Sequence, residues 1–197
     1  MKWENKAGET LDNCVVIHRV TEPYGALSNM SNDFSLTING MKIRSSEALY
    51  QSLRYPLRPD WQRDILDAKH AMLAKMKSKK QGRRKESRED WSDIRVSVMR
   101  WVLRLKLAQH PPVLRLLCGS MQHPIVEKSA RDSFWGAVQG NDGWLRGENK
   151  LGRLFMELRL EISQYGIDAE EKIRVVPAPM IEGLLLLGEP VRQWPEG

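Results

Sequence analysis

The sequence has 197 residues, of which 41% are hydrophobic and 28% charged, a composition typical of a globular protein with a buried core. Its longest aliphatic run, Leu184–Leu187, is far shorter than a membrane span, and no signal-peptide core follows Met1, so we expect a cytoplasmic protein that does not bind membranes. Only two cysteines, Cys14 and Cys118, are present and they lie far apart, which excludes a disulfide scaffold. The histidines show no ligand spacing, which argues against a dedicated zinc site. We expect neither a metal nor a cofactor.

The net charge of +6 is concentrated in one segment. Between Lys69 and Arg88 there are nine lysines or arginines and one acid, Glu86, whereas the other residues carry 22 basic and 24 acidic side chains. Such a concentration is typical of a surface that binds a phosphate-rich partner, although a solvated helix face followed by a basic loop gives the same pattern. The residues expected to contact nucleic acid are Lys77, Lys79, Lys80, Arg83, Arg84, Lys85 and Arg88.

The chain begins with strands and turns. Val15–Val20 has the composition of a strand, and the loop Gly25–Asn29 lets the backbone approach a ligand closely. Phe34–Ile38 and Met41–Arg44, joined by Asn39-Gly40, predict a β-hairpin, because Asn-Gly favours the positive φ angles of a tight turn.

A helix is predicted over Glu47–Tyr55, with Ser45 or Ser46 as its N-cap. Glu47 and Gln51 are four residues apart and therefore share one face. Glu47 also lies in the first turn, where the helix dipole favours its ionised form. Taken alone, the pair is most simply a capping carboxylate followed by an exposed glutamine.

Further helices are predicted over Trp61–Ala68, Lys69–Met76 and Asp90–Gln109, the last beginning with a capping-box-like Ser87. Lys106 lies on the edge of the apolar stripe of this longest helix. A lysine there either extends to water, which is the commoner arrangement, or has its ammonium in a pocket. The stripe consists of Trp91, Ile94, Val98, Val102 and Leu105.

The stretch from Glu127 to Arg153 combines a loop, which carries Asp132 and Trp135, with the start of an apolar helical stripe that Asn149 is placed to cap. A helix N-terminus offers free N–H groups and a partial positive charge to an anion. A carboxylate, an indole and this helix end together resemble a nucleotide site. A capped helix with the tryptophan in the core is the structural alternative.

A short helix over Leu114–Cys118 and a strand over Pro124–Lys128 precede this stretch, and an extended tail with one or two short strands follows Gly166. Strands that precede most of the helices predict an α+β fold, a mainly helical, compact single domain with a small N-terminal hairpin or sheet. We expect a polar lead-in over residues 1–14, a catalytic domain over 15–165, and a C-terminal extension over 166–197 that packs back on the domain.

Five segments, in this order, resemble the NADAR family. They are Gly25–Asn29, Ser46–Gln51, the helix from Asp90 to Leu107, Asp132–Gly136 and Glu148–Arg159. Five motifs in order are far more specific than one of them. The resemblance covers roughly residues 15–162. It implies a mainly helical α+β domain that hydrolyses N-glycosidic bonds to ribose in nucleotide-like substrates.

One branch of the family acts on phosphoribosyl intermediates of riboflavin synthesis. Another removes ADP-ribose from guanine, and some of its members are antitoxins paired with DarT-type DNA ADP-ribosyltransferases. This chain looks more like the second branch, because Met76–Lys79 replaces the Met-Gly-Arg of short members, and Arg84–Arg88 and Leu187–Pro190 resemble guanine-directed members.

The resemblance therefore implies an ADP-ribosyl-guanine hydrolase that acts on single-stranded DNA or on a free nucleotide, as a monomer, with a DarT-type toxin encoded nearby as its partner. The alternatives are an N-glycosidase of riboflavin intermediates and a module that binds ADP-ribose or nucleic acid without turnover.

Cleavage of the bond between ribose C1 and a base nitrogen builds positive charge on the sugar, which a carboxylate stabilises, while the departing base needs a proton. Glu47 and Asp132 are the candidate carboxylates, although Asp132 alternatively holds ribose hydroxyls. Lys106 offers a second route, because a desolvated lysine can form a Schiff base with C1 of an opened ribose. The candidate catalytic residues are thus Glu47, Lys106 and Asp132.

For substrate binding, Trp91 and Trp135 are candidates to stack on a base, although a core position is equally expected for Trp91. Asn149 and the N–H groups after it would hold the diphosphate or ribose. The full set of expected substrate-binding residues is Gly25, Ser28, Asn29, Gln51, Trp91, Trp135, Gly136, Asn149 and Gly152.

Overall fold

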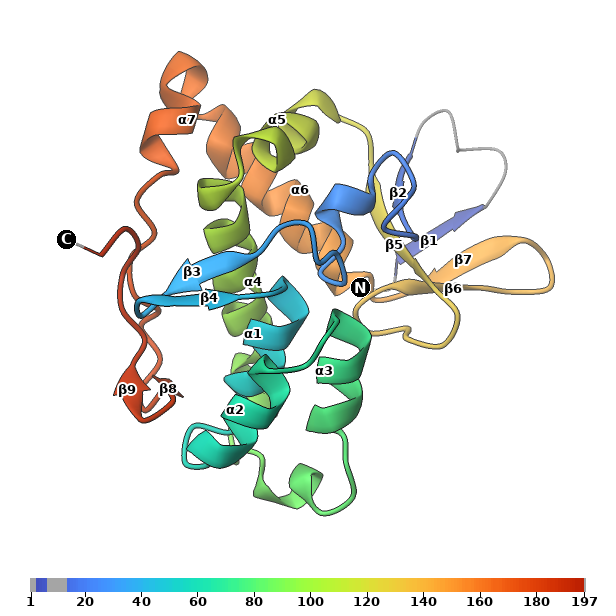
Figure 1. Cartoon of the computed structure of the whole chain (residues 1–197). Helices are drawn as coiled ribbons and strands as arrows, with labels where there is room; N and C mark the ends of the chain where they lie inside the picture. Colours follow the sequence, from blue (N-terminus) through green and yellow to red (C-terminus); the bar gives the residue numbers. More distant parts are fainter. Residues whose placement is uncertain (1–2, 7–13, 197) are drawn as a thin grey trace. The chain divides into compact units, whose positions relative to one another are not determined.

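The computed structural model describes residues 3–6 and 14–196, and it confirms a mixed α+β fold (Figure 1). The chain forms two compact units. Unit 1 is built from residues 1–28 and 112–169, and unit 2 from residues 29–111 and 170–197. Most of the predicted lead-in lies outside the described residues, but its residues Trp3–Lys6 form a strand, β1.

Unit 1 contains a five-stranded sheet in the order β1-β7-β6-β5-β2. The pairs β2–β5 and β5–β6 are parallel, and β6–β7 and β7–β1 are antiparallel. The sequence did not predict β6 and β7, because strands this short carry too few alternating residues to show a period. The four strands after β1 are β2 (Val15–Ile17), β5 (Ile125–Ser129), β6 (Ala137–Gln139) and β7 (Trp144–Gly147).

The helix α6 (Lys150–Ser163) packs against β5 in unit 1. Its predicted apolar stripe is confirmed, since Leu151, Leu154, Phe155, Leu158 and Ile162 are all buried. The helix α5 (Pro111–Gly119) begins at the Pro111-Pro112 pair that ends the long helix, because proline suits the first position of a helix and not its interior. Short 3₁₀ turns occur at Gly25–Leu27 and Gly166–Asp168.

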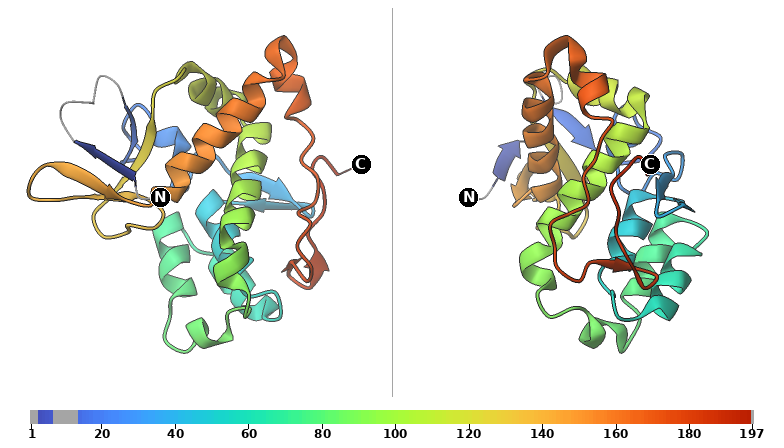
Figure 2. Two further views of the ribbon diagram at one scale, coloured as in Figure 1. Left: turned by 180° about the vertical axis from the view of Figure 1, so that it is seen from behind. Right: turned by 90° about the vertical axis from the view of Figure 1, so that its left-hand side faces the viewer.

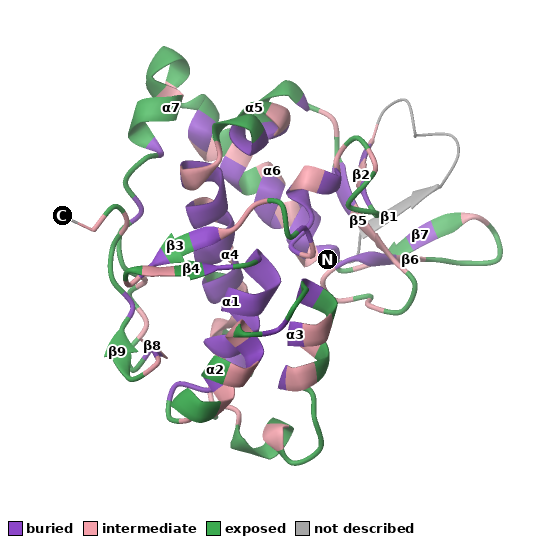
Figure 3. Ribbon diagram, viewed as in Figure 1, coloured by how far each residue is buried: buried purple, intermediate pink, exposed green. Residues whose placement is uncertain are grey.

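Unit 2 begins with the predicted hairpin, β3 (Leu36–Ile38) and β4 (Met41–Ile43), whose turn residues Asn39 and Gly40 have φ angles of 50° and 68°. The helix α1 (Ser46–Ser52) is buried along its whole length (Figure 3) and packs against three other helices. These are α2 (Pro59–Leu66), α3 (Ala71–Ser78) and α4 (Trp91–Gln109), with a 3₁₀ turn at Arg83–Glu86 before α4.

The capping box predicted at the start of α4 is wrong. The N-cap is Asp90, whose side chain makes no capping bond and instead accepts hydrogen bonds from Arg88. The hydroxyl of Ser87 accepts a hydrogen bond from Arg54 Nε at 2.8 Å. Arginine competes successfully for both side chains because charge-assisted hydrogen bonds are stronger than a cap to a backbone N–H.

The C-terminal tail contains α7 (Ala169–Lys172), β8 (Leu185–Leu186) and β9 (Glu189–Pro190). The part of the tail that contains β8 and β9 lies beside the β3–β4 hairpin and α2 within unit 2 (Figures 1 and 2). Trp101 Nε1 of α4 donates to the Pro177 carbonyl at 2.9 Å, and Asn39 Nδ2 of the hairpin turn donates to the Pro190 carbonyl at 2.9 Å. The tail is therefore part of unit 2 and not a separate element.

Candidate active site

Glu47 lies in the first turn of α1, where its position is fixed by two backbone hydrogen bonds. Ser45 caps the helix by accepting a hydrogen bond from the Ala48 N–H at 3.2 Å, and the Glu47 N–H donates to the Asn29 carbonyl at 3.1 Å. The Glu47 side chain is only 6% exposed. A carboxylate is rarely buried without partners, because its desolvation is costly. Glu47 is therefore more than an exposed helix cap.

Two side chains contact the Glu47 carboxylate. Gln51 Nε2 donates to Glu47 Oε1 at 2.9 Å, and Lys75 Nζ of α3 lies 3.9 Å from the same oxygen. Gln51 is 5% exposed, so the expectation of an exposed glutamine is wrong. The sequence did not single out Lys75, because a lysine inside a basic segment carries no signal that it faces a carboxylate from another helix.

Gln51 is itself held by Ser78 at the end of α3. The Ser78 hydroxyl lies 2.6 Å from Gln51 Oε1 and 2.9 Å from the Lys75 carbonyl oxygen. The Tyr55 hydroxyl donates to the Ser78 carbonyl at 2.5 Å. The Glu47 carboxylate is thus the end of a buried polar chain that joins α1 to α3.

Asn29 is a second buried polar group next to α1. It is 5% exposed, and its Nδ2 lies 3.0 Å from the sulfur of Met99. Its Oδ1 has no hydrogen-bond partner among the residues that the structure describes. Buried amide oxygens are seldom left unpaired, so this oxygen is a suitable acceptor for a substrate hydroxyl. This geometry fits the binding role predicted for Asn29.

Lys106 is buried, with 1% of its surface exposed, in the C-terminal half of α4. Its ammonium lies 5.2 Å from the centre of the Phe34 ring. Burial lowers the pKa of Lys106 to about 7, although the charge of Asp33 acts in the opposite direction. The more common arrangement, in which such a lysine reaches water, is wrong here. The side chain is buried within the fold instead.

Lys106 and Glu47 have different electrostatic neighbours within unit 2. The charge of Asp33 raises the pKa of Lys106. The pKa of His110 is lowered by burial and, less strongly, by the charge of Lys106, whereas a hydrogen bond to the Ser35 carbonyl raises it. Lys75 is the cation that faces Glu47. Lys75 therefore lies against the predicted catalytic carboxylate.

Trp91 occupies the core position that was one of its two interpretations. It is 7% exposed and packs on Tyr50, with ring centroids 5.1 Å apart. The guanidinium of Arg54 lies 6.0 Å from the centroid of the Trp91 ring. Its neighbours explain the position of Trp91 without a ligand.

In unit 1, Asp132 shapes the loop that it belongs to. Its Oδ1 accepts hydrogen bonds from the N–H groups of Phe134 at 3.1 Å and Trp135 at 2.9 Å. Trp135 is half-buried and meets the Phe134 ring edge-on, with centroids 5.1 Å apart. The catalytic role of Asp132 and the stacking role of Trp135 remain predictions.

Asn149 does not cap α6 with its side chain, which corrects the sequence expectation. Its Oδ1 accepts from the Glu127 N–H at 3.1 Å, and its Nδ2 donates to the Ile125 carbonyl at 2.8 Å. The amide thus continues the hydrogen-bonding pattern of β5 and ties the sheet to the helix. Because both the oxygen and the nitrogen of the amide are hydrogen-bonded to β5, the Asn149 side chain is poorly suited to bind a ligand.

The expected free N–H groups at the start of α6 are also occupied. The N–H groups of Asn149, Lys150 and Leu151 donate to the carbonyls of Gly136, Phe134 and Trp135, respectively. The loop before the helix therefore takes the place that an anion would fill. These three N–H groups are thus not free donors in the structure, and the diphosphate-binding role predicted for Asn149 and the groups after it stays a prediction.

Three predicted glycines are needed for backbone packing. A Cβ at Gly25 would collide with the Val20 carbonyl, and one at Gly152 with the Ile125 carbonyl. A Cβ at Gly136 would collide with the Glu127 carbonyl. Close approach of backbone segments explains these glycines without a bound ligand.

The basic segment is partly neutralised within the chain. Lys77 and Arg83 both pair with Asp64, at 2.8 Å and 2.7 Å, and Arg88 pairs with Asp90 at 2.6 Å. These three residues are therefore less suited to contact nucleic acid than predicted. The exposed basic residues that remain for this role are Lys79, Lys80, Arg84 and Lys85.

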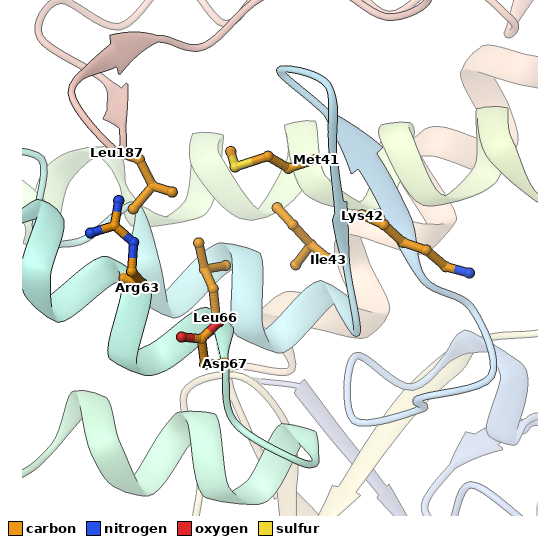
Figure 4. Close-up of a pocket in the computed structure, with 7 residues that line it drawn as sticks. All are labelled: Met41, Lys42, Ile43, Arg63, Leu66, Asp67 and Leu187. Carbon is orange, nitrogen blue, oxygen red and sulfur yellow. The ribbon is translucent and has the colours of Figure 1, made fainter.

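A pocket of about 360 Å³ in unit 2 is lined by none of the predicted site residues (Figure 4). Met41 and Ile43 of β4 contribute to it, with Arg63 and Leu66 of α2 and Leu187 of the tail, whereas the Lys42 side chain extends away from the others. No cluster of three or more metal-ligating side chains occurs among residues 3–6 and 14–196. The helices formed by these residues are too short or too polar to span a membrane.

A known domain family matches most of the chain. The model of the NADAR domain matches residues 17–163, which is more than half of the chain. This chain therefore belongs to the NADAR family, as its five motifs indicated.

The proteins similar to the chain include two curated relatives and one solved structure. A riboflavin biosynthesis protein of Vibrio vulnificus is 32% identical over 79% of this chain and 40% of the relative. The N-glycosidase YbiA of Escherichia coli is 28% identical over 77% of this chain and 90% of the relative. The NMR structure of E. coli YbiA has a TM-score of 0.68 at 26% identity, over 80% of this chain and 89% of that one.

Proposed function

We propose that this protein is an N-glycosidase that hydrolyses the bond between ribose C1 and the nitrogen of a base. The observation that carries the proposal is the buried Glu47 carboxylate, oriented by Gln51 and faced by Lys75. A fixed carboxylate in a site from which water is largely excluded suits stabilisation of a positively charged sugar. The names of relatives as N-glycosidases support the same reaction.

In this mechanism, Glu47 stabilises the charge that develops on C1 as the C1–N bond breaks, and it accepts a proton from the attacking water. The hydroxide then forms the new bond to C1, the departing base takes a proton from solvent on its nitrogen, and Glu47 afterwards returns its proton to solvent. Asn29 Oδ1 is a candidate acceptor for a ribose hydroxyl. Lys75, whose ammonium lies 3.9 Å from Glu47 Oε1, would help to keep the carboxylate in place while the substrate binds.

Lys106 provides a second route on a sugar that has opened at C1. Its amine attacks C1, the base leaves with a proton, and the resulting imine is hydrolysed by water to release the sugar and restore the amine. The lowered pKa of Lys106, about 7, makes a large fraction of the neutral nucleophile accessible at neutral pH.

For the substrate, we propose guanine carrying ADP-ribose in single-stranded DNA. The four exposed basic residues Lys79, Lys80, Arg84 and Lys85 support this choice, because a free phosphoribosyl compound does not need such a surface. A DarT-type toxin is the partner that this substrate implies. A second candidate, an intermediate of riboflavin synthesis, is favoured by the similarity to the Vibrio protein.

The test is mass spectrometry of a short single-stranded DNA that bears one ADP-ribosylated guanine. Release of ADP-ribose with recovery of unmodified guanine is expected, and Glu47→Gln should lower the rate about 10²–10⁴-fold. Lys42→Gln, a substitution at an exposed position, is the control and should keep the rate of the wild type. An unchanged oligonucleotide with folded protein would contradict the DNA substrate, and turnover of a phosphoribosyl riboflavin intermediate in a parallel assay would establish the second candidate.

A further inference from the structure

We infer that Gln51 and Ser78 form a hydrogen-bond relay that holds Glu47 in one position in both of its protonation states. The inference rests on the proposed function, because an acid–base carboxylate must gain and lose a proton in each turnover. A partner that suits only the ionised carboxylate would release it at the moment of proton transfer. The relay removes this conflict.

The geometry of the relay is a line of buried polar atoms. Gln51 bridges Glu47 Oε1, at 2.9 Å from its nitrogen, and the Ser78 hydroxyl, at 2.6 Å from its oxygen. The same hydroxyl lies 2.9 Å from the Lys75 carbonyl. Ser78 is 0% exposed and Gln51 5% exposed, so water does not compete for these contacts.

The Ser78 hydroxyl has one proton to donate but two acceptors within reach, Gln51 Oε1 and the Lys75 carbonyl. When Glu47 is ionised, Gln51 Nε2 donates to the carboxylate and the Ser78 hydroxyl donates to Gln51 Oε1. The Lys75 carbonyl is then a second acceptor that the hydroxyl does not use. The two hydrogen bonds of the relay then run in one direction, from Ser78 through Gln51 to Glu47.

When Glu47 is protonated, the direction reverses. The carboxyl O–H donates to Gln51 Oε1 after the amide turns about its last bond, and Gln51 Nε2 donates to Ser78 Oγ. The Ser78 hydroxyl then donates to the Lys75 carbonyl, 2.9 Å away. An amide has nearly the same shape in both orientations, so the heavy atoms stay in place and no buried group loses its partner.

Among the described residues, one charged group from another element forms an ion pair with the Glu47 carboxylate. It is the Lys75 ammonium on α3, which is 30% exposed and lies 3.9 Å from Glu47 Oε1. Gln51 has both ends of its amide engaged by Glu47 and Ser78. Gln51 and Ser78 therefore act through Glu47 and are positioning residues, in place of the substrate-binding role predicted for Gln51.

The kinetic test compares Ser78→Ala with the conservative variant Ser78→Thr and with the matched control Ser52→Ala. Ser52 is also a buried helix serine, but its hydroxyl donates only to the Leu49 carbonyl, 2.8 Å away. Loss of one hydrogen bond in the relay should lower kcat about tenfold with KM nearly unchanged. Ser78→Thr should restore kcat, and Ser52→Ala should leave it unchanged. Equal losses in Ser78→Ala and Ser52→Ala, or none in either, would overturn the relay.

A second measurement does not depend on turnover. The side-chain amide signals of Gln51, identified by their loss in Gln51→Met, are followed by ¹⁵N NMR across pH. The relay predicts one titration step that disappears in Glu47→Gln. A protein that shows this step but cleaves no N-glycoside would leave the relay intact and refute the proposed function. An active protein whose Gln51 signals do not change with pH would refute the relay. This measurement is made on the wild type, so it does not depend on whether a Ser78 variant folds.

Discussion

Burial determines the chemistry of two ionisable side chains in unit 2. Glu47 loses contact with water but gains Gln51 and Lys75, so its carboxylate keeps polar partners. Lys106 is buried more completely, with an aromatic ring 5.2 Å from its ammonium, and burial lowers its pKa to about 7. An exposed lysine is almost fully protonated at neutral pH, whereas a large fraction of Lys106 carries a neutral amine there.

The first residue-scale prediction concerns covalent trapping of Lys106. Borohydride added during turnover should reduce a Schiff base and leave a sugar adduct on Lys106, detectable by peptide mass spectrometry. Lys106→Ala should show no adduct, and the exposed variant Lys79→Ala should still form one. A wild-type enzyme that turns over without any adduct would leave Glu47 as the main catalyst.

The second prediction concerns the pH dependence of stability. Because the pKa of Lys106 falls from 10.5 to about 7 on folding, the unfolded chain binds more protons between these values. The free energy of unfolding should therefore rise with pH across this interval, and the full penalty for burying the charge is present below about pH 7.

Lys106→Met removes this penalty. At pH 6 the variant should be more stable than the wild type by on the order of a few kcal/mol, and its stability should change less between pH 7 and 10. Urea unfolding at several pH values measures both effects, with Lys79→Met as the exposed control. Equal slopes for the wild type and Lys106→Met would show that Lys106 is not the group responsible.

At the scale of elements, the segment from α3 to the start of α4 combines two roles. Lys77 and Arg83 hold α3 and the loop after it to Asp64 of α2, so their charges are used within the fold. Lys79 and Lys80, just after α3, are exposed. One run of basic residues in the sequence is thus divided into structural ion pairs and an exposed surface.

This division predicts the salt dependence of activity on DNA. If Lys79, Lys80, Arg84 and Lys85 each contact one phosphate of a single strand, the logarithm of kcat/KM should fall with the logarithm of salt concentration with a slope of about −3. Replacing all four by glutamine should bring the slope close to zero, whereas activity on a free ADP-ribosylated nucleotide should not change. A DNA reaction of the wild type that ignores salt would argue against this surface.

At the scale of the whole molecule, one buried side chain, Gln62, helps to hold the tail of unit 2. Gln62 is 0% exposed, and its Nε2 donates to the carbonyls of Ser52 and Leu185 at 3.2 Å and 2.7 Å. Its Oε1 accepts from the Leu187 N–H at 2.6 Å. A single amide thereby connects α1, α2 and a strand more than 120 residues further along the chain.

We expect Gln62→Leu to loosen this tail. The variant leaves the Leu185 carbonyl and the Leu187 N–H without partners, at a cost of about 2–4 kcal/mol. Limited proteolysis should then cut residues 176–190 faster than in the wild type, while Gln81→Leu, a change at an exposed glutamine, should have no effect. Equal cleavage rates in the wild type and Gln62→Leu would contradict this role.

The sequence by itself determined the features that depend on neighbours along the chain. Local backbone geometry, with a period of two or about four residues, explains four of these features. They are the Asn39-Gly40 hairpin, the helix with Lys106, the buried stripe of α6 and the shared face of Glu47 and Gln51. The five NADAR motifs were likewise local. The short strands β6 and β7 were not predicted, because three or four residues are too few to establish a period.

Only the tertiary structure decided what these side chains contact. It placed Lys75 and Ser78 at the Glu47–Gln51 pair, buried Lys106 and Trp91, and directed Asn149 to β5 instead of its own helix. Each of these outcomes depends on segments distant in the chain that exclude water from a side chain or present a hydrogen-bond partner to it. Local patterns specify which face a residue occupies, but the free energy of burying or pairing it is set by whatever covers that face.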